Sequence, residues 1–366
     1  MKARIIIGAN YGDESKGTIV ARYTKQNNSE NVLNILTNGG AQRGHSILTK
    51  DGSITYQHFG SGTYFGADTY YSRFFILNPM QFAKEYLELV VKPTNIYYDR
   101  NCRWSTPFDM MSNNIENKLK NAHATCGMGI WNTIKRYRDI GGIAFDVFMS
   151  YDMDSKKRYL NNIKAYYEKY LTIPDDIKMI WNSENILIHF IMDCAFFKKH
   201  TSQQQLHEVT YDEFIFENGQ GLLLSDTGKD TYDTTPSKTG IEYSKTLLKE
   251  LSIIDIDDQI IEGNKVVAHY VTRPYITRHG DGEIENQKTR NNISENVLED
   301  RTNHWNEFQG EFRYGLLDID SLKDRIINDS GNIPYVVELT HCDEMDRVVE
   351  FKKYFDKINT YDTPLV

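Results

Sequence analysis

The fold is decided by one stretch near the N-terminus, which reads Ile5-Ile6-Ile7-Gly8-Ala9-Asn10-Tyr11-Gly12-Asp13-Glu14-Ser15-Lys16-Gly17-Thr18. An apolar run followed by a glycine-containing turn predicts a buried strand, a tight loop and a helix start. Such a junction directs backbone N–H groups and a helix N-terminus at an anion, usually phosphate. Lys16 adds a positive charge, Thr18 a hydroxyl, and Asp13 a carboxylate that an ordinary phosphate loop lacks. Because the order Lys16-Gly17-Thr18 departs from a Walker A loop, an ordinary strand–turn–helix junction stays open for these residues alone.

A second cluster follows the apolar run Val32–Leu36 and reads Asn38-Gly39-Gly40-Ala41-Gln42-Arg43-Gly44-His45-Ser46. Its glycines allow the backbone to approach a ligand closely. His45 has the chemistry for proton transfer or for a hydrogen bond to a developing oxyanion. A lone histidine beside a glycine is more often structural. Its position one β-α unit after an acid-bearing phosphate loop makes His45 a catalytic candidate.

Seven segments in a fixed order resemble the adenylosuccinate synthetase family. Residues 12–17 resemble its GDEGKG loop, and Gly44-His45-Ser46 resembles its asparagine-alanine-glycine-histidine-threonine segment. Ser61-Gly62 follows His58 as in the family's proline-serine-glycine turn, and residues 125–130 resemble its threonine-threonine-glycine-arginine-glycine loop. Residues 216–221 are similar to its glutamine-bearing loop, residues 277–280 to its threonine-arginine-valine-glycine segment, and residues 339–343 to its leucine-threonine-lysine-leucine-aspartate strand end.

The resemblance implies an α/β fold with an open, mostly parallel central sheet flanked by helices. We expect a P-loop-like nucleotide-binding architecture with extra subdomains, all within a single domain spanning residues 1–366. It also implies a ligase that moves the γ-phosphoryl of a triphosphate to the 6-oxygen of a purine monophosphate, after which L-aspartate displaces phosphate at C6. The purine needs to lose its N1 proton before it attacks, so a carboxylate is needed as base. Asp13 matches that base, His45 the residue that steadies the 6-oxygen, and Lys16 neutralises phosphate charge.

The resemblance further implies three ligand sets and a metal site. The triphosphate set comprises Gly12, Glu14, Ser15, Lys16, Gly17, Thr18, Gly44, His45, Ser46, Thr340 and Asp343. The monophosphate set comprises Asp13, Gln42, Thr125, Cys126, Arg138, Gln220, Thr234, Thr235 and His279. Arg313 and Gln309 are expected to bind aspartate. Mg²⁺ is expected to be held mainly by phosphates, together with Asp13 and the Gly44 carbonyl.

The chain departs from the family where arginines would bind the aspartate carboxylates and the ribose. In the corresponding residues 306–318 only Arg313 survives, and Met128 stands where the family has another arginine. An arginine fork binds a carboxylate bidentately, which no aromatic side chain does. Either another cation such as Arg273, Arg278 or Arg301 takes over, or the ligands are held differently.

These departures favour a particular acceptor. Residues 309–314 look like the phage branch of the family, which acts on dGMP and leads to 2-aminoadenine in DNA. Loss of an arginine that contacts the ribose 2′-hydroxyl also suits a deoxynucleotide. Against this, phage enzymes of that type carry serine in place of the base, whereas Asp13 is retained here. The sequence slightly favours dGMP, and IMP stays open.

The triphosphate is also open. Asp343 could accept hydrogen bonds from guanine N1 and N2, which favours GTP. His341 replaces the family lysine whose stem would stack on the base, so ATP remains an alternative. Asp343 could instead cap the next element, residues 344–354, which have helical composition.

Two other classes of protein share some of these features. A P-loop-like kinase or GTPase would have the phosphate loop and Asp343 but no dependence on aspartate. A nucleotide-binding protein that has lost catalysis would explain the missing arginines, although Asp13, Lys16 and His45 together argue against it.

The basic cluster of Lys135, Arg136 and Arg138 has two interpretations. In the family, an arginine after the threonine-glycine loop reaches the partner subunit and holds its monophosphate, which implies a homodimer. Alternatively, the cluster is a solvated helix face.

Composition sets bounds on partners and location. A net charge of -9 argues against a nucleic-acid surface, which would need a basic stripe. Four cysteines without CxxC spacing fit reduced thiols better than disulfides or zinc. No signal peptide and no apolar stretch near the ~20 residues of a membrane span are found, so we expect a cytoplasmic protein of a bacterium or a phage-infected cell.

Apolar runs and helical patterns predict the element order. Strands are expected at residues 3–7, 32–36, 74–77, 214–216, 265–271 and 335–339, and helices at 17–25, 79–91, 154–171, 183–199 and 344–354. Helical insertions are expected around residues 80–210. Residues 283–306 are polar and are expected to form a mobile loop or short helix over the site.

Overall fold

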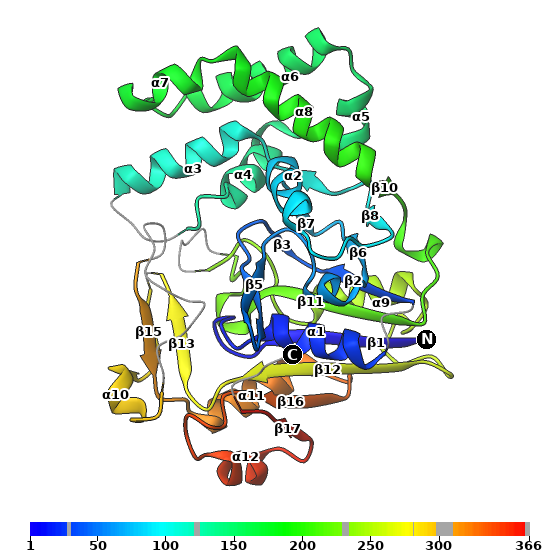
Figure 1. Ribbon diagram of the computed structural model, residues 1–366, viewed down its shortest axis with the longest axis vertical. Helices are drawn as coiled ribbons and strands as arrows, with labels where there is room; N and C mark the ends of the chain where they lie inside the picture. The colour runs from blue at the N-terminus through cyan, green and yellow to red at the C-terminus, as the bar shows by residue number, and fades with distance from the viewer. Residues whose placement is uncertain (28–30, 121–124, 229–233, 281, 298–309, 363–366) are drawn as a thin grey trace.

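The computed structural model describes residues 1–27, 31–120, 125–228, 234–280, 282–297 and 310–362. Its centre is a nine-stranded sheet in which every pair of neighbouring strands is parallel (Figure 1). In spatial order the strands are β10 (Ser202–Gln203), β8 (Ile96–Tyr98), β6 (Asp68–Tyr71), β2 (Val32–Leu36), β11 (Glu213–Gly221), β1 (Lys2–Gly8), β12 (Lys265–Thr272), β16 (Tyr335–Leu339) and β17 (Ile358–Thr360). The open parallel sheet confirms the predicted fold class.

The isoleucine run forms the middle of this sheet because both of its faces are covered. Ile5 and Ile7 pack into the larger core, Ile6 packs into a separate core on the other face, and all three are 0% exposed. A strand buried on both faces reads as a continuous apolar run, which is what residues 5–7 show.

Helices cover the two faces through these cores. Ile19 and Val20 of α1 (Lys16–Gln26) pack with Ile6. On the other face, α9 (Glu242–Glu250) and α11 (Ile319–Ser330) contribute Leu247 and Leu322 to the core that holds Ile5. The last helix is α12 (Val348–Tyr354). Parallel strands with helices on both faces place their carboxyl ends along one edge, where ligands bind in open α/β sheets.

A helical layer lies beyond the β10 end of the sheet, at the top of Figure 1. It consists of α2 (Pro79–Glu88), α3 (Pro107–Lys120), α4 (Ile130–Ile140), α5 (Phe145–Ser150), α6 (Met153–Glu168), α7 (Asp175–Trp181) and α8 (Glu184–His200). Aromatic side chains such as Trp104 and Trp181 fill its core. These helices occupy the region where helical insertions were expected.

The basic cluster on α4 does not match either interpretation for Arg136. Arg136 is fully buried, and its Nε lies 2.8 Å from Oδ1 of the equally buried Asp109. It therefore ties α4 to α3. Arg138, by contrast, is 59% exposed and lies 3.6 Å from Asp139.

Three small sheets complete the fold. One has the order β13 (Ile276–His279), β15 (Phe312–Gly315) and β14 (Gln287–Lys288), and it lies beside the short α10 (Arg290–Ile293). Another contains β3 (Gly39–Gly40), β7 (Phe75–Leu77) and β9 (Arg103–Trp104). The third is the hairpin of β4 (His45–Thr49) and β5 (Gly52–Tyr56). Three 3₁₀ turns are also described: η1 (Ser61–Phe65), η2 (Leu206–Glu208) and η3 (Leu222–Leu224).

The expected elements are largely confirmed, with instructive differences. The run at residues 74–77 is a strand, but it belongs to a small sheet. The main sheet instead uses β6, whose sequence Asp68-Thr69-Tyr70-Tyr71 lacks an aliphatic run. The last helix begins at Val348, not at residue 344.

The polar segment 283–306 contains β14 and α10, so part of it is ordered secondary structure. Its mobility stays a prediction, and residues 298–306 lie outside the described residues. Among the described helices, none is both long and apolar enough to cross a membrane.

Candidate active site

The phosphate loop joins β1 to α1 and is held by a buried carboxylate. Glu14 is 2% exposed, and its Oε1 accepts hydrogen bonds from the backbone N–H groups of Asn10 (3.2 Å) and Gly12 (2.9 Å). Burial raises the pKa of Glu14. Its side chain therefore shapes the loop from inside. Ser15, with φ of 72°, occupies the left-handed region at the N-cap of α1, where the resembling loop has glycine.

Lys16 lies in the hollow of this loop. Its side chain is almost fully buried, and Nζ donates to the Gly12 carbonyl at 2.6 Å. Burial lowers the pKa of Lys16. Because burial disfavours the charged ammonium, a phosphate that enters the loop would stabilise the charged form of Lys16.

The first turn of α1 packs tightly against β4. A Cβ at Gly17 would lie 2.7 Å from the Ser46 carbonyl, so only glycine fits there without a shift. The Thr18 hydroxyl accepts a hydrogen bond from the Leu48 N–H at 3.2 Å. Thr18 thus joins the phosphate loop helix to the strand that begins with His45.

His45 is held from behind by a buried ion pair. Its Nδ1 lies 2.5 Å from Oε1 of Glu217, and its Nε2 lies 2.8 Å from the Gly219 carbonyl. Glu217 also accepts from Arg43 at 2.8 Å and from the Ser61 hydroxyl at 2.7 Å. The side chains of Arg43 and Glu217 are both 0% exposed.

These contacts determine the protonation of His45 and Glu217. Burial, reinforced by Arg43, lowers the pKa of His45 to about 4. Although burial acts in the opposite direction, Arg43 and the His45 hydrogen bond lower the pKa of Glu217 to about 2. At neutral pH, Glu217 is therefore ionised, and a neutral His45 ring donates its one N–H to either the Glu217 carboxylate or the Gly219 carbonyl.

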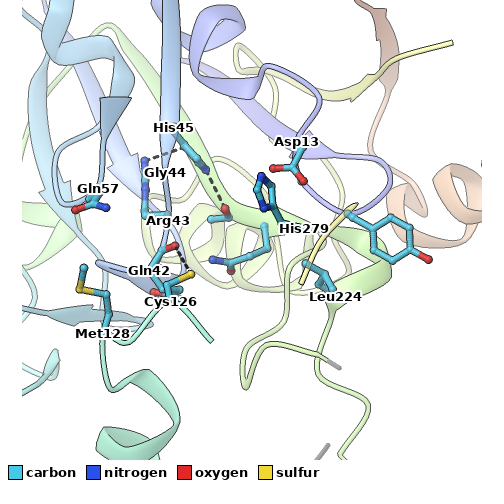
Figure 2. A pocket seen from close by; sticks show the side chains of 14 residues that line it. Asp13, Gln42, Arg43, Gly44, His45, Gln57, Cys126, Met128, Leu224 and His279 are labelled. Carbon is cyan, nitrogen blue, oxygen red and sulfur yellow. Dashed lines mark hydrogen bonds between the residues drawn. The ribbon is translucent and has the colours of Figure 1, made fainter. Parts of the chain in front are cut away.

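A cavity of about 340 Å³ opens at this edge of the sheet (Figure 2). It is lined by Tyr11, Gly12, Asp13, Gln42, Arg43, Gly44, His45, Gln57, Cys126, Met128, Gly219, Gln220, Leu224 and His279. The structure thus brings together the expected base, the expected histidine and several residues of the expected monophosphate set. The Asp13 carbonyl accepts from Nε of Arg273 at 2.9 Å, which anchors the backbone beside the carboxylate.

Other expected site residues lie off the cavity wall. The Thr125 hydroxyl bonds Asn113 and Asn117, and the Thr235 N–H donates to the Leu224 carbonyl. Arg313 donates through Nη2 to the carbonyls of Gly280 and Gly282. Neither Arg138 nor Thr234 lines the cavity, and Gln309 lies outside the described residues.

The end of β16 reaches the phosphate loop from the other side. The Thr340 hydroxyl lies 3.2 Å from the Glu14 carbonyl, and His341 is buried with φ of 59°. Asp343 does not cap α12, because that helix begins at Val348 with Arg347 at its N-cap. The capping interpretation of Asp343 is therefore wrong.

Sequence reasoning missed the residues that support the site. Glu217 was noted only as part of a loop motif, although an acid at the end of the apolar run 214–216 was a usable signal. The burial of Arg43 and the contact of Arg325 Nη2 with Asn10 Oδ1 (2.7 Å) depend on tertiary packing and left no signal.

Comparisons with known proteins gave a match to one family and matches to solved structures. The sequence model of the adenylosuccinate synthetase family matches residues 5–354. No match was found among curated proteins. The chain is similar to the fully ligated adenylosuccinate synthetase from Plasmodium falciparum, with a TM-score of 0.66 and 19% identity over 93% of this chain and 77% of that chain. It is also similar to cyanophage S-2L succinoaminodeoxyadenylate synthetase bound to dGMP and to dATP as an energy donor, with a TM-score of 0.65 and 12% identity over 98% of this chain and 91% of that chain. At these identities the two structures establish a shared fold.

Proposed function

The chain belongs to the adenylosuccinate synthetase family, and from this premise we propose that it is a ligase that takes dGMP as its acceptor and GTP as its phosphoryl donor. The observation that carries the proposal is the cavity in which Asp13 and His45 meet at the phosphate loop. Ligases of this type join aspartate to a purine nucleotide, so the open questions are the acceptor, the donor and the role of each residue.

Asp13 is proposed as the base that removes the N1 proton of the purine. The resulting anion attacks the γ-phosphorus through O6, the diphosphate leaves, and a 6-phosphoryl intermediate forms. The aspartate amine then adds at C6, and phosphate departs with the former O6. Deprotonation first is required because a neutral lactam oxygen is a poor nucleophile toward phosphate.

His45 and Lys16 are proposed to stabilise charge during phosphoryl transfer. His45 lines the cavity, its Nε2 lies 2.8 Å from the Gly219 carbonyl, and the Glu217 contact at Nδ1 holds the ring. Lys16, enclosed in the loop, meets the phosphates with the loop N–H groups. Preorganised donors of this kind account for much of phosphoryl-transfer catalysis.

The residues present fit Mg²⁺. The Asp13 carboxylate and Gly44 line the same cavity and offer the oxygen ligands that this ion prefers. Within the described ranges, no group of three or more His, Cys, Asp or Glu residues could hold a metal without further ligands. Phosphate oxygens would complete the coordination, and the ion would neutralise charge on them.

Two features support dGMP as the acceptor. Phe312 and Tyr314 lie in β15, where an arginine tract would contact a ribose 2′-hydroxyl, so a deoxyribose loses nothing there. The structural match to the phage synthetase covers 98% of this chain, and that synthetase was solved bound to dGMP. IMP is the second candidate, because Asp13 retains the acid of the family's GDEGKG loop.

GTP is proposed as donor because Asp343 has the chemistry to accept from guanine N1 and N2. The Thr340 hydroxyl lies 3.2 Å from the Glu14 carbonyl, so the chain three residues before Asp343 contacts the phosphate loop. Adenine offers no matching pair of donors, although the phage relative binds dATP. Loss of GTP preference on altering Asp343 is the test of this assignment.

The remaining assignments are also proposals. Gln42, Cys126, Gln220 and His279 line the cavity and would contact the acceptor nucleotide. Thr125, Thr234 and Thr235 would bind its monophosphate, as would Arg138 if a homodimer brings it to a partner's site. Arg313 and Gln309 would hold aspartate.

The test measures phosphate release with Mg²⁺, aspartate and either GTP or ATP, with dGMP, GMP, IMP and dIMP in parallel. Products are weighed by mass spectrometry. A succinyl adduct on dGMP is expected. An adduct on IMP alone would identify IMP, and not dGMP, as the acceptor. Phosphate release that does not depend on added aspartate would indicate a kinase or GTPase activity instead.

A further inference from the structure

His279 is a polar side chain in the cavity, and the proposed chemistry gives it no step in phosphoryl transfer or in the addition of the amine. It ends β13 and lines the cavity with Asp13. Its Nδ1 is buried and has no hydrogen-bond partner within the described residues. A buried ring nitrogen without a partner destabilises the fold unless a ligand supplies one. The resembling family segment has valine here, so the imidazole is an addition of this chain.

The ring of His279 is held in place by a second departure from the family. Phe312 lies directly opposite His279 in the antiparallel pair of β13 and β15. The two ring centroids are 4.8 Å apart, and Tyr314 packs on Phe312 at 5.3 Å. Phe312 and Tyr314 therefore support the imidazole, which makes it a preorganised contact.

On this part of the wall, Tyr11 and Leu224 offer no buried acceptor that lacks a partner, whereas the Oε1 atoms of Gln42 and Gln220, elsewhere on the wall, are buried and also have no partner among the described residues. The Tyr11 hydroxyl donates to the Glu283 carbonyl at 3.2 Å, and Leu224 is apolar. The amides of Gln42 and Gln220 both lie within 3.4 Å of a Cβ built on Gly39, at the β3 wall. Figure 2 shows Asp13 and His279 on the right of the cavity and Gln42 on the left.

We propose that His279 determines base specificity by accepting a hydrogen bond from the 2-amino group of a guanine acceptor. The inference rests on the proposed function, which sets O6 at His45 and N1 at Asp13. In the purine ring C2 follows N1, so the 2-amino group lies next to the N1 position at Asp13, and His279 lines the same cavity as Asp13. A neutral imidazole carries one nitrogen lone pair that can accept from this amine. Hypoxanthine has only hydrogen at C2 and makes no such contact.

The experiment compares dGMP with dIMP, which differ only in the 2-amino group. kcat/KM is measured for both with the wild type, with His279→Val and with His279→Asn. His279→Val should lower kcat/KM for dGMP about 10- to 100-fold more than for dIMP, because the buried amine loses its partner. His279→Asn, which keeps an acceptor, should recover part of the preference and provides a readout if the valine variant does not fold.

Leu224→Ala is the matched control, because it trims the same wall without removing a hydrogen-bonding group. It should change the two acceptors alike. Equal losses for dGMP and dIMP in His279→Val would overturn the proposal. So would a preference that disappears in Gln42→Ala and survives in His279→Val.

Equilibrium binding of dGMP and dIMP separates this inference from the proposed reaction. A wild type that binds dGMP more tightly than dIMP, and a valine variant that does not, supports the role of His279 even if no adduct forms. Turnover with no difference in binding or in kcat/KM between the variants refutes the His279 role and leaves the reaction intact.

Discussion

Replacing Glu217 with Gln should destabilise the fold and slow catalysis together, because one buried carboxylate holds both Arg43 and His45. Glu217 lies 2.8 Å from Arg43 and 2.5 Å from His45, and it also accepts from the Ser61 hydroxyl and N–H. The side chains of Glu217 and Arg43 are 0% exposed. Removing one partner of a buried pair leaves an uncompensated charge.

The expected magnitude follows from that burial. Breaking a buried ion pair by altering one partner typically lowers the free energy of unfolding by about 3–5 kcal/mol. Whole domains are stable by about 5–15 kcal/mol, so the Glu217→Gln variant should unfold at a markedly lower urea concentration. The slope of the urea transition should stay unchanged, because the same surface is exposed on unfolding. The turnover number kcat should also fall, since His45 loses the contact that fixes its ring.

A double-mutant cycle tests the reasoning. Arg43→Met combined with Glu217→Gln removes both charges and should be more stable than the sum of the single losses predicts. Asp175→Asn, at the exposed ion pair with Lys178, is the control and should leave the urea midpoint unchanged. Additive single losses, or a Glu217→Gln midpoint equal to that of the control, would refute the account of a buried pair.

Three further predictions concern chemistry, specificity and pH. Asp13→Asn should abolish turnover while nucleotide binding, measured by calorimetry, stays near normal, because a base is removed and the side-chain shape is kept. Asp343→Asn should erase a preference for GTP over ATP in kcat/KM, and a retained preference would remove Asp343 from the donor site. Burial lowers the pKa of His58 to about 3, so its unfolded form binds a proton that the folded form excludes. The free energy of unfolding should therefore fall as pH drops from about 6.5 toward 3, and His58→Gln should flatten this dependence in urea titrations.

The sheet was predictable where strands are buried on both faces. The isoleucines of β1 and the aliphatic run of β2 are apolar segments, and such segments predict buried strands. The bounds of β2 and β16 are those expected from the sequence. β6 was missed because its sequence begins with Asp68 and continues with Thr69 and two tyrosines. Its tyrosines are buried by neighbouring elements, which is information that a local window does not contain.

The cavity residues Asp13 and His45 were predictable from the sequence, and the buried residues that hold the site in place were not. Asp13 and His45 follow strands whose ends meet at one edge, so motif spacing suffices to bring them together. The role of Glu217 depends on β11 lying between β1 and β2, which only the topology provides. Arg136 looked like a surface or intersubunit cation, and the buried Asp109 that pairs with it is 27 positions away.

The most direct test of the central claim follows the oxygen at C6 of the acceptor. The acceptor is labelled with ¹⁸O at this position, incubated with Mg²⁺, aspartate and GTP, and the released phosphate is weighed by mass spectrometry. If O6 is phosphorylated and then displaced by the amine, each released phosphate carries one ¹⁸O atom, and the label leaves the purine. Unlabelled phosphate, with the ¹⁸O still on the purine, would contradict the account.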